Sequence, residues 1–268
     1  MLKDITLGQF FPGNSVVHKL DPRTKLVMLM VYIVALFLAV SWVSYAVMLL
    51  FLVVSVAISH IPPKSLVKGM KPLVLILVFT GLLNIFFTTG EHVLVSFWKI
   101  TIYMEGLQRA FFMVVRILML ISGTFLLTYT TSPIALTDGL ESLLGPLKAI
   151  KVPVHELSMM MCIALRFIPT LIEETDKIMS AQKARGADFE NGKLMERVKA
   201  LIPILVPLFI SAFRRADELA TAMECRCYQG GEGRTKMKLL RYMRRDYLCY
   251  MIGVLLLAVI IMLSSFGL

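Results

Sequence analysis

Five long stretches of this 268-residue chain carry almost no charge, and they constrain its fold more than any other feature. They cover residues 26–42, 43–59, 72–89, 106–130 and 248–263, and the only charges inside them are Arg109 and Arg116. Each is about as long as a helix that crosses the hydrocarbon core of a membrane. A lipid-exposed backbone must satisfy its own hydrogen bonds, so we expect five transmembrane helices. The mean hydropathy of +0.77 excludes a soluble domain of this size.

Basic residues are distributed unevenly between these stretches. They lie before the first span, between the second and third, and in the long segment before the last, as Lys19, Arg23, Lys25, Lys64, Lys68 and Lys71 and many later residues. Loops rich in Lys and Arg stay in the cytoplasm. The sequence therefore predicts a multi-pass protein of the cell membrane with a cytoplasmic N-terminus and an extracellular C-terminus.

The spacing of the spans predicts an all-α fold, a polytopic helical bundle of about five spans with a cytoplasmic helical domain, which is called the coupling domain below. Residues 1–130 form the membrane domain with the first four spans, residues 131–246 the coupling-helix domain, and residues 247–268 the last span. The coupling domain contains two apolar runs, 152–168 and 201–213. We expect both to lie against the membrane surface or the bundle, because the first contains Glu156 and Arg166 and the second contains two prolines.

The charge of the coupling domain argues against a nucleic-acid partner. Residues 131–246 hold 18 Lys and Arg against 14 Asp and Glu, which is a mixed surface and not a polybasic arm. Membrane lipids with acidic headgroups are the simpler partner for the remaining positive charge of the chain.

Two amphipathic helices are predicted in this domain, each with an arginine at its end. The first begins near Pro169 and ends at Ala184-Arg185-Gly186, and the second runs over residues 207–226 into Cys225-Arg226-Cys227. Their apolar residues recur at helical spacing. In the second helix alanines repeat every four residues, at 212, 216 and 220, so that another helix could approach closely along this stripe.

Several short motifs, spread over essentially the whole length, resemble a known family. They are Leu20-Asp21-Pro22-Arg23-Thr24-Lys25, Ser132-Pro133 with Leu136-Thr137-Asp138-Gly139-Leu140, Arg166-Phe167-Ile168-Pro169, Ala181-Gln182-Lys183-Ala184-Arg185-Gly186 and Gly230-Gly231-Glu232-Gly233-Arg234-Thr235. The family that they resemble is EcfT, the transmembrane T component of energy-coupling factor (ECF) transporters of the ABC type. The resemblance implies two cytoplasmic ABC ATPase subunits and a membrane-embedded, substrate-binding S component as partners.

The resemblance also implies site residues. The ends of the coupling helices would dock into the ATPases through Ala184, Arg185, Gly186, Cys225, Arg226 and Cys227, and Met159, Met160, Met161 and Arg116 would contact the S component or the scaffold. The second motif departs from the Ala-Arg-Gly pattern of the family at both cysteines. The loss of glycine at position 227 leaves its backbone turn in question, and Gly230 and Gly231 offer one way to replace it.

The same residues also have simpler structural interpretations. Each motif arginine could only cap its own helix, the methionines could be ordinary core, and Arg116 could pair with backbone carbonyls or with a second protein. His155-Glu156 lacks the second histidine of a zinc-protease motif, and the glycine-rich stretch after position 229 lacks the spacing of a phosphate loop. Cys225-x-Cys227 has no further His or Cys nearby in the sequence, so plain thiols are favoured over a metal site.

The expected function is therefore that of a non-catalytic subunit. The chain itself would carry no catalytic residue, metal or cofactor, and ATP would be bound by the partner subunits. By resemblance it would couple ATP-driven motion to the uptake of vitamins or other micronutrients. The alternatives are a stand-alone secondary transporter and a membrane enzyme, although the spans contain no Asp or Glu for ion coupling and no catalytic cluster is assembled.

Overall fold

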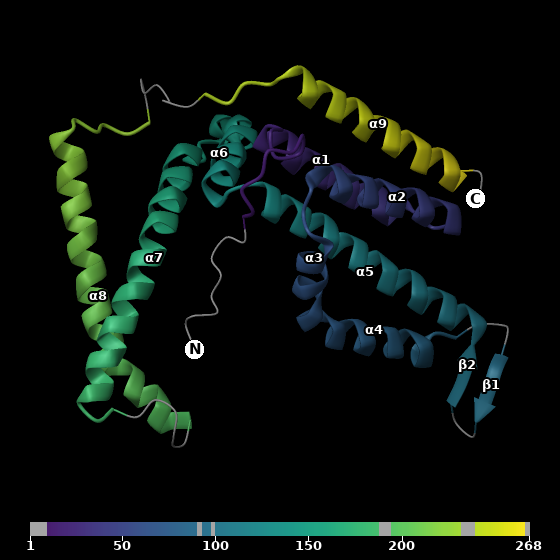
Figure 1. The fold of residues 1–268 in the computed structure, drawn as a ribbon, viewed down its shortest axis with the longest axis horizontal. Coiled ribbons are helices and arrows are strands. Elements are labelled where there is room, and N and C mark those ends of the chain that lie inside the picture. Colours follow the sequence, from purple (N-terminus) through teal and green to yellow (C-terminus); the bar gives the residue numbers. More distant parts are fainter. Residues whose placement is uncertain (1–9, 90–92, 98–99, 188–193, 232–238, 266–268) are drawn as a thin grey trace. The chain divides into compact units, whose positions relative to one another are not determined.

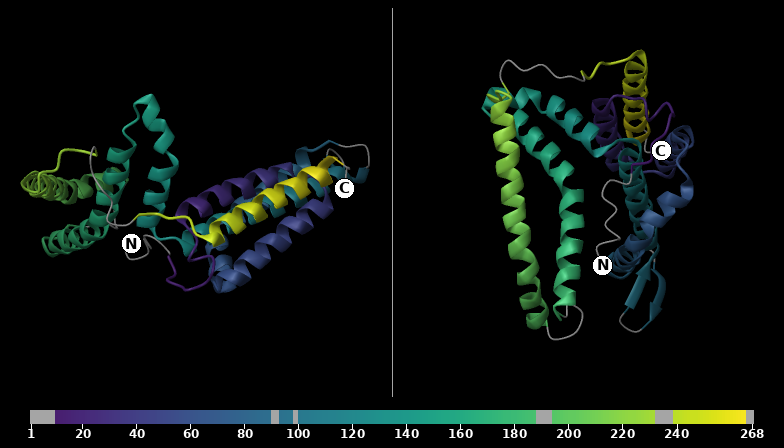
Figure 2. Two further views of the ribbon diagram at one scale, coloured as in Figure 1. Left: turned by 90° about the horizontal axis from the view of Figure 1, so that it is seen from above. Right: turned by 60° about the vertical axis from the view of Figure 1, so that its left-hand side comes forward.

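The computed structural model describes residues 10–89, 93–97, 100–187, 194–231 and 239–265 (Figures 1 and 2). Residues 232–235 of the glycine-rich motif lie outside the described residues. The helices are α1 (Pro22–Leu38), α2 (Trp42–Ser59), α3 (Pro63–Met70), α4 (Val74–Phe87), α5 (Met104–Thr130), α6 (Pro133–Leu143), α7 (Val154–Ala184), α8 (Leu194–Cys225) and α9 (Arg244–Ser265). Two 3₁₀ turns, Lys71–Leu73 and Gly145–Ile150, precede α4 and α7.

The fold class is confirmed, because helices form the architecture and several are apolar enough to cross a membrane. The sequence did not predict a pair of short strands. Strands β1 (Val93–Phe97) and β2 (Ile100–Tyr103) pair antiparallel between α4 and α5.

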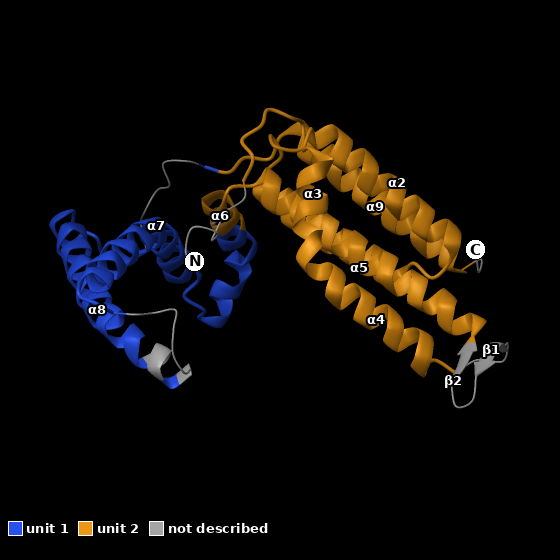
Figure 3. Ribbon diagram, turned by 60° about the horizontal axis from the view of Figure 1, so that its bottom comes forward, with its two compact units in different colours: residues 1–7, 140–239 blue, residues 8–139, 240–268 orange. Residues whose placement is uncertain are grey.

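The described residues form two compact units, which Figure 3 shows in different colours. One unit contains the described residues up to Gly139 and from Leu240 onward, and therefore α1 to α5 and α9. The other contains those between Leu140 and Leu239, and therefore α7 and α8. The domain boundaries predicted from the sequence, after residues 130 and 246, stay a prediction.

Helix α1 packs at the centre of the first unit. Its buried residues Tyr32, Ala35 and Leu36 share one apolar core with residues of α2, α5 and α9. The neighbours approach so closely that a Cβ added to Gly123 of α5 would lie 2.7 Å from the Tyr32 ring, and one on Gly253 of α9 would lie 2.6 Å from a methionine sulfur. Glycine at these two positions therefore permits the close approach of α5 and α9 to α1.

Among the described residues, five helical segments are long and apolar enough to cross a membrane: α2, α3 with α4, α5, α7 and α9. Four of them coincide with predicted spans. The first predicted span falls on α1, whose 17 residues lie at the short end of the sufficient range. Helix α7 was expected to lie outside the membrane, and its mean hydropathy of 1.3 is the lowest of the five.

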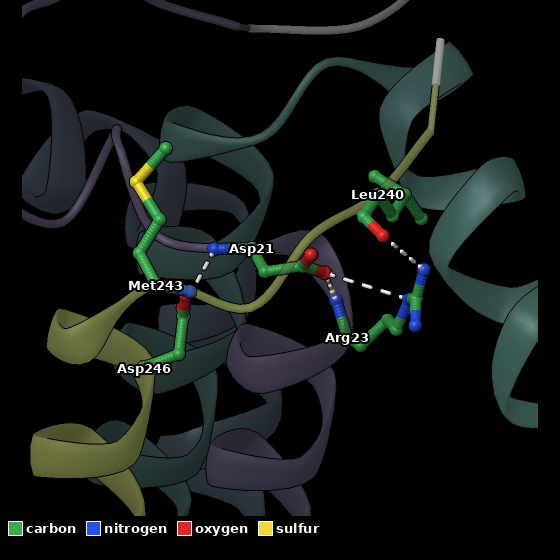
Figure 4. A network of polar contacts seen from close by, with 5 residues as sticks. All are labelled: Asp21, Arg23, Leu240, Met243 and Asp246. Carbon is green, nitrogen blue, oxygen red and sulfur yellow. Dashed lines mark hydrogen bonds and ion pairs between the residues drawn. The ribbon is translucent and has the colours of Figure 1, made fainter.

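A polar cluster joins the beginnings of α1 and α9 (Figure 4). Asp21 is the N-cap of α1, and one of its carboxylate oxygens accepts the Arg23 backbone N–H at 2.9 Å. The buried carboxylate of Asp246 in turn accepts the backbone N–H groups of Asp21 at 2.9 Å and Met243 at 2.8 Å. The guanidinium of Arg23 donates to the Leu240 carbonyl at 3.2 Å. The Leu20–Lys25 motif is therefore a structural joint.

The same motif also holds the end of α5. The ammonium of Lys25 donates to the Thr130 carbonyl at 2.9 Å and to the Thr131 hydroxyl at 3.2 Å. A cation at this place complements the unpaired carbonyls at a helix C-terminus. One turn of α1 thus holds both α9 and α5.

Two predicted helix starts are wrong. Helix α7 passes through Pro169 without a break, and α8 passes through Pro203 and Pro207. A proline inside a helix removes one N–H donor but leaves the hydrogen bonds of the flanking turns in place, so apolar packing can carry the helix past it. Most of the apolar run 152–168 thus lies in α7, and the run 201–213 lies in α8. At 31 and 32 residues, each helix is about 47 Å long instead of about 25 Å.

We expect Asp246→Ala to destabilise the protein in mild detergent. It would leave the buried backbone N–H of Asp21 and the partly buried N–H of Met243 without their acceptor, at a cost of about 2 kcal/mol or more. The measurement is the melting temperature of the purified chain. Asp217→Ala, at an exposed aspartate of α8, is the control and should leave the melting temperature unchanged. An equal melting temperature for both variants would show that the joint contributes nothing.

The membrane topology can be tested at the C-terminus. If α1 spans and α7 does not, the chain crosses five times and its C-terminus is outside the cell. A C-terminal alkaline phosphatase fusion should then be active and a C-terminal fluorescent-protein fusion dark. The opposite pair of results would contradict the predicted topology and indicate an even number of crossings, either because α7 crosses as well or because α1 does not.

Candidate functional site

Helices α7 and α8 lie side by side and antiparallel within their unit (Figures 1 and 2). Glu174 of α7 contacts Ser211 and Arg215 of α8, whereas Gln182, further along α7, donates to the carbonyl of Pro203, earlier on α8. The C-terminal ends of the two helices therefore point in opposite directions. Arg185 and Arg226 end up at opposite ends of one helical pair.

The end of α7 is closed by a pattern of backbone hydrogen bonds known as a Schellman motif. The N–H of Ala187 donates to the Gln182 carbonyl at 3.0 Å, and that of Gly186 to the Lys183 carbonyl, also at 3.0 Å. Gly186 has φ +89°, and an added Cβ would meet nothing within 4 Å. Glycine is favoured there by its left-handed backbone and not by crowding.

The end of α8 repeats this pattern. The N–H of Tyr228 donates to the Met223 carbonyl at 3.0 Å, and that of Cys227 to the Glu224 carbonyl at 2.8 Å. Cys227 itself has φ +57°, so it adopts the left-handed conformation that Gly186 adopts in the first motif. The turn has therefore not moved to Gly230 and Gly231. Because a non-glycine residue pays a steric penalty in this conformation, the second helix end is the more strained.

All six residues of the two motifs are exposed. Within the described part of the chain, the guanidinium groups of Arg185 and Arg226 form no ion pair. Both arginines occupy the C-cap position, next to the negative end of the helix dipole. This placement fits a capping role, and it also leaves the donors of both side chains accessible to another protein.

The packing faces of the two helices were predicted with unequal success. In α7 the helical spacing of the apolar residues predicts one packing face, and this face is partly buried, at Leu171, Ile172, Thr175, Ile178, Met179 and Gln182. In α8 only Ala212 of the alanine stripe is partly buried, whereas Ala216 and Ala220 are exposed, so the approach of another helix along the stripe stays a prediction. The face that is withdrawn from solvent instead includes Ile204, Leu208, Ser211, Arg215 and Leu219. A stripe of small residues permits close packing, but only the position of the partner helix selects the face.

The three predicted methionines lie near the beginning of α7. Met160 is 55% exposed, whereas Met159 and Met161 are partly buried. Consecutive residues of a helix point about 100° apart, so the three cannot form a single surface. Met160 is the member available to a partner, and the role of all three in binding an S component stays a prediction.

Arg116 already has partners within its own unit. Its guanidinium donates to the carbonyl of Ala39, the C-cap of α1, at 3.1 Å, and it lies 5.7 Å and 5.8 Å from the ring centroids of Phe37 and Tyr45. A cation over aromatic rings and at a helix C-terminus is well stabilised. The hydrogen bond to Ala39 matches the simpler interpretation, in which Arg116 pairs with a backbone carbonyl. Contact between Arg116 and a partner protein stays a prediction.

No group of three or more His, Cys, Asp or Glu side chains that could hold a metal ion occurs among the described residues. His155, which begins the incomplete zinc-protease motif, contacts a carboxylate oxygen of Glu141 through Nδ1 at 3.1 Å. Cys225 and Cys227 are both exposed on either side of Arg226.

The strain at the end of α8 has a measurable consequence. We expect Cys227→Gly to stabilise the protein by up to about 1 kcal/mol, because glycine adopts positive φ without a steric penalty. Cys225→Gly, two residues earlier and still in the helix, should instead destabilise it by about 0.5 kcal/mol. Melting temperatures and amide hydrogen exchange at positions 227 and 228 check both. The same sign for the two variants would contradict the assignment of the turn to Cys227.

Known proteins are similar to this chain over most of its length. Residues 13–237 match the family model described as CbiQ, cobalt transport protein. A protein of Ruminiclostridium cellulolyticum is 54% identical over 264 residues, which cover 98% of each chain. Another, of Bacillus subtilis, is 50% identical over 246 residues, or 92% of this chain and 93% of its own. Both are named energy-coupling factor transporter transmembrane protein EcfT, and this chain belongs to that family of transport proteins.

Proposed function

We propose that this chain is the energy-coupling scaffold of an ECF importer, in which two cytoplasmic ATPases bind at Arg185 and Arg226. The observation that carries the proposal is the pair of matched helix ends. Both have the same hydrogen-bonded turn, both present an exposed arginine, and they lie at opposite ends of α7 and α8. Two helix ends with the same turn and an exposed arginine suit two ATPase subunits.

Arginine is well suited to such docking. Its guanidinium stays charged and presents five donors in a fixed fork, so it can bind a carboxylate or several carbonyls in a groove of the partner. Arg185 and Arg226 are exposed and form no ion pair among the described residues, so no such pair there must break before the partner binds.

The membrane partner of this scaffold is an S component that selects the substrate. Helix α8 exposes Leu205, Phe209 and Phe213, and α7 exposes Met160, which together supply apolar contact area. In this proposal the S component carries a vitamin or a transition-metal ion, and the matching family model is described by cobalt transport. Motion of the ATPases would reach it through α7 and α8.

ATP would be bound and hydrolysed by the partner subunits alone, and this chain would contribute neither a catalytic residue nor a cofactor. For the ATPases to reach both arginines, α7 and α8 must have their ends in the cytoplasm. This requirement agrees with the distribution of Lys and Arg along the chain.

The docking role predicts a loss of uptake when the guanidinium groups are removed. Truncation of a central interface arginine weakens association about thirtyfold or more, so Arg185→Ala with Arg226→Ala should release both ATPases and abolish ATP-driven uptake. The measurements are co-purification of the ATPases in mild detergent and uptake in proteoliposomes. Arg214→Ala, at an exposed arginine of α8, is the control. Full uptake by the double variant would refute the docking role.

A further inference from the structure

Helices α7 and α8 are joined by a three-residue polar contact that the docking motifs do not include. Both carboxylate oxygens of Glu174 are used, since one accepts the Arg215 guanidinium at 2.8 Å and the other the Ser211 hydroxyl at 2.5 Å. Ser211 and Arg215 are four residues apart, on one face of α8. The contact thus joins one point of α7 to one face of α8.

The ion pair between Glu174 and Arg215 is partly buried. The side chains of Glu174 and Arg215 are 24% and 32% exposed, and they lie within the mainly apolar interface of the two helices. Solvent screens such a pair less than an exposed one, and removal of one partner leaves the other charge half-buried. The adjacent residues Glu173 and Arg214 carry the same charges but are exposed, and neither is in an ion pair among the described residues.

The position of the pair relative to the motifs is symmetrical. Arg185 follows Glu174 by eleven residues, and Arg226 follows Arg215 by eleven residues. Eleven residues are about three helical turns, or about 16 Å, and they return to nearly the same helical face. Because α7 and α8 are antiparallel, the two motifs extend in opposite directions from the pair by equal lengths.

We propose that the Glu174–Arg215 pair is the pivot of the coupling helices, which holds the two docking arginines at a fixed mutual spacing. This inference rests on the proposed docking function. Glu174 and Arg215 are positioning residues, because they act on the ATPases only through Arg185 and Arg226. With the pivot intact, α7 and α8 move as one body when the ATPases close. Without it, the helices slide or splay, and ATP is hydrolysed with less transport.

The functional test uses the complete transporter in proteoliposomes and measures the uptake per ATP hydrolysed. Glu174→Gln and Arg215→Gln should each lower this ratio about three- to thirtyfold, with the ATPases still bound. The exchange Glu174→Arg with Arg215→Glu should restore most of the ratio, and Glu173→Gln and Arg214→Gln are the matched controls. A wild-type ratio in both single variants, or no recovery in the exchange variant, would overturn the pivot.

A second measurement does not need the ATPases. With the four native cysteines replaced by alanine, spin labels at the exposed positions Ser180 and Thr221, each six residues beyond the pair, report the spacing of the two helices. The distance distribution should be narrow in the wild type, broad in Glu174→Gln and narrow again in the exchange variant. Equal widths in all three would overturn the pivot. Full uptake after loss of both motif arginines would instead refute the docking function, whatever the labels report.

Discussion

The buried carboxylate of Asp246 is the contact on which the membrane unit depends most. Its oxygens accept N–H groups from the entrance of α1 and from the turn before α9, so the first and last helices are joined although 225 residues separate Asp21 from Asp246. Lys25, one turn further along α1, binds the end of α5. Since hydrocarbon offers no hydrogen-bond partner, these polar groups gather where the helices begin and end, and apolar packing governs the remainder.

Among the described residues, helices α7 and α8 are held together by fewer contacts than the helices of the membrane unit. Their long faces are amphipathic and much of their apolar surface is exposed in the isolated chain, so few internal contacts define how they lie against each other. The polar contacts between them include those of Glu174 with Ser211 and Arg215, and of Gln182 with Pro203. They therefore indicate which part of α8 lies beside which part of α7. In the proposed function, such a pair with matched ends would receive force at two points.

The helix ends at Arg185 and Arg226 differ in sequence but share one backbone geometry. One motif is Ala-Arg-Gly and the other Cys-Arg-Cys, yet the hydrogen bonds that close the two helices are the same. Cys227 accepts a left-handed backbone that glycine adopts freely, so the position of the arginine is retained at some cost in stability. The geometry around the arginine is thus common to both ends, although their side chains differ.

Much of this protein follows from its sequence alone. Apolar length and charge distribution determine the helical membrane fold, because a lipid-exposed backbone must satisfy its hydrogen bonds within each span, and the motifs around Arg185 and Arg226 mark the helix ends. The tertiary structure alone decided that α7 and α8 pass through their prolines, and that Ala216 and Ala220 lie away from α7. It also revealed the links from Asp21 to Asp246 and from Glu174 to Arg215. Local patterns describe which faces can pack, whereas contacts between distant residues depend on where the chain places the partner helix.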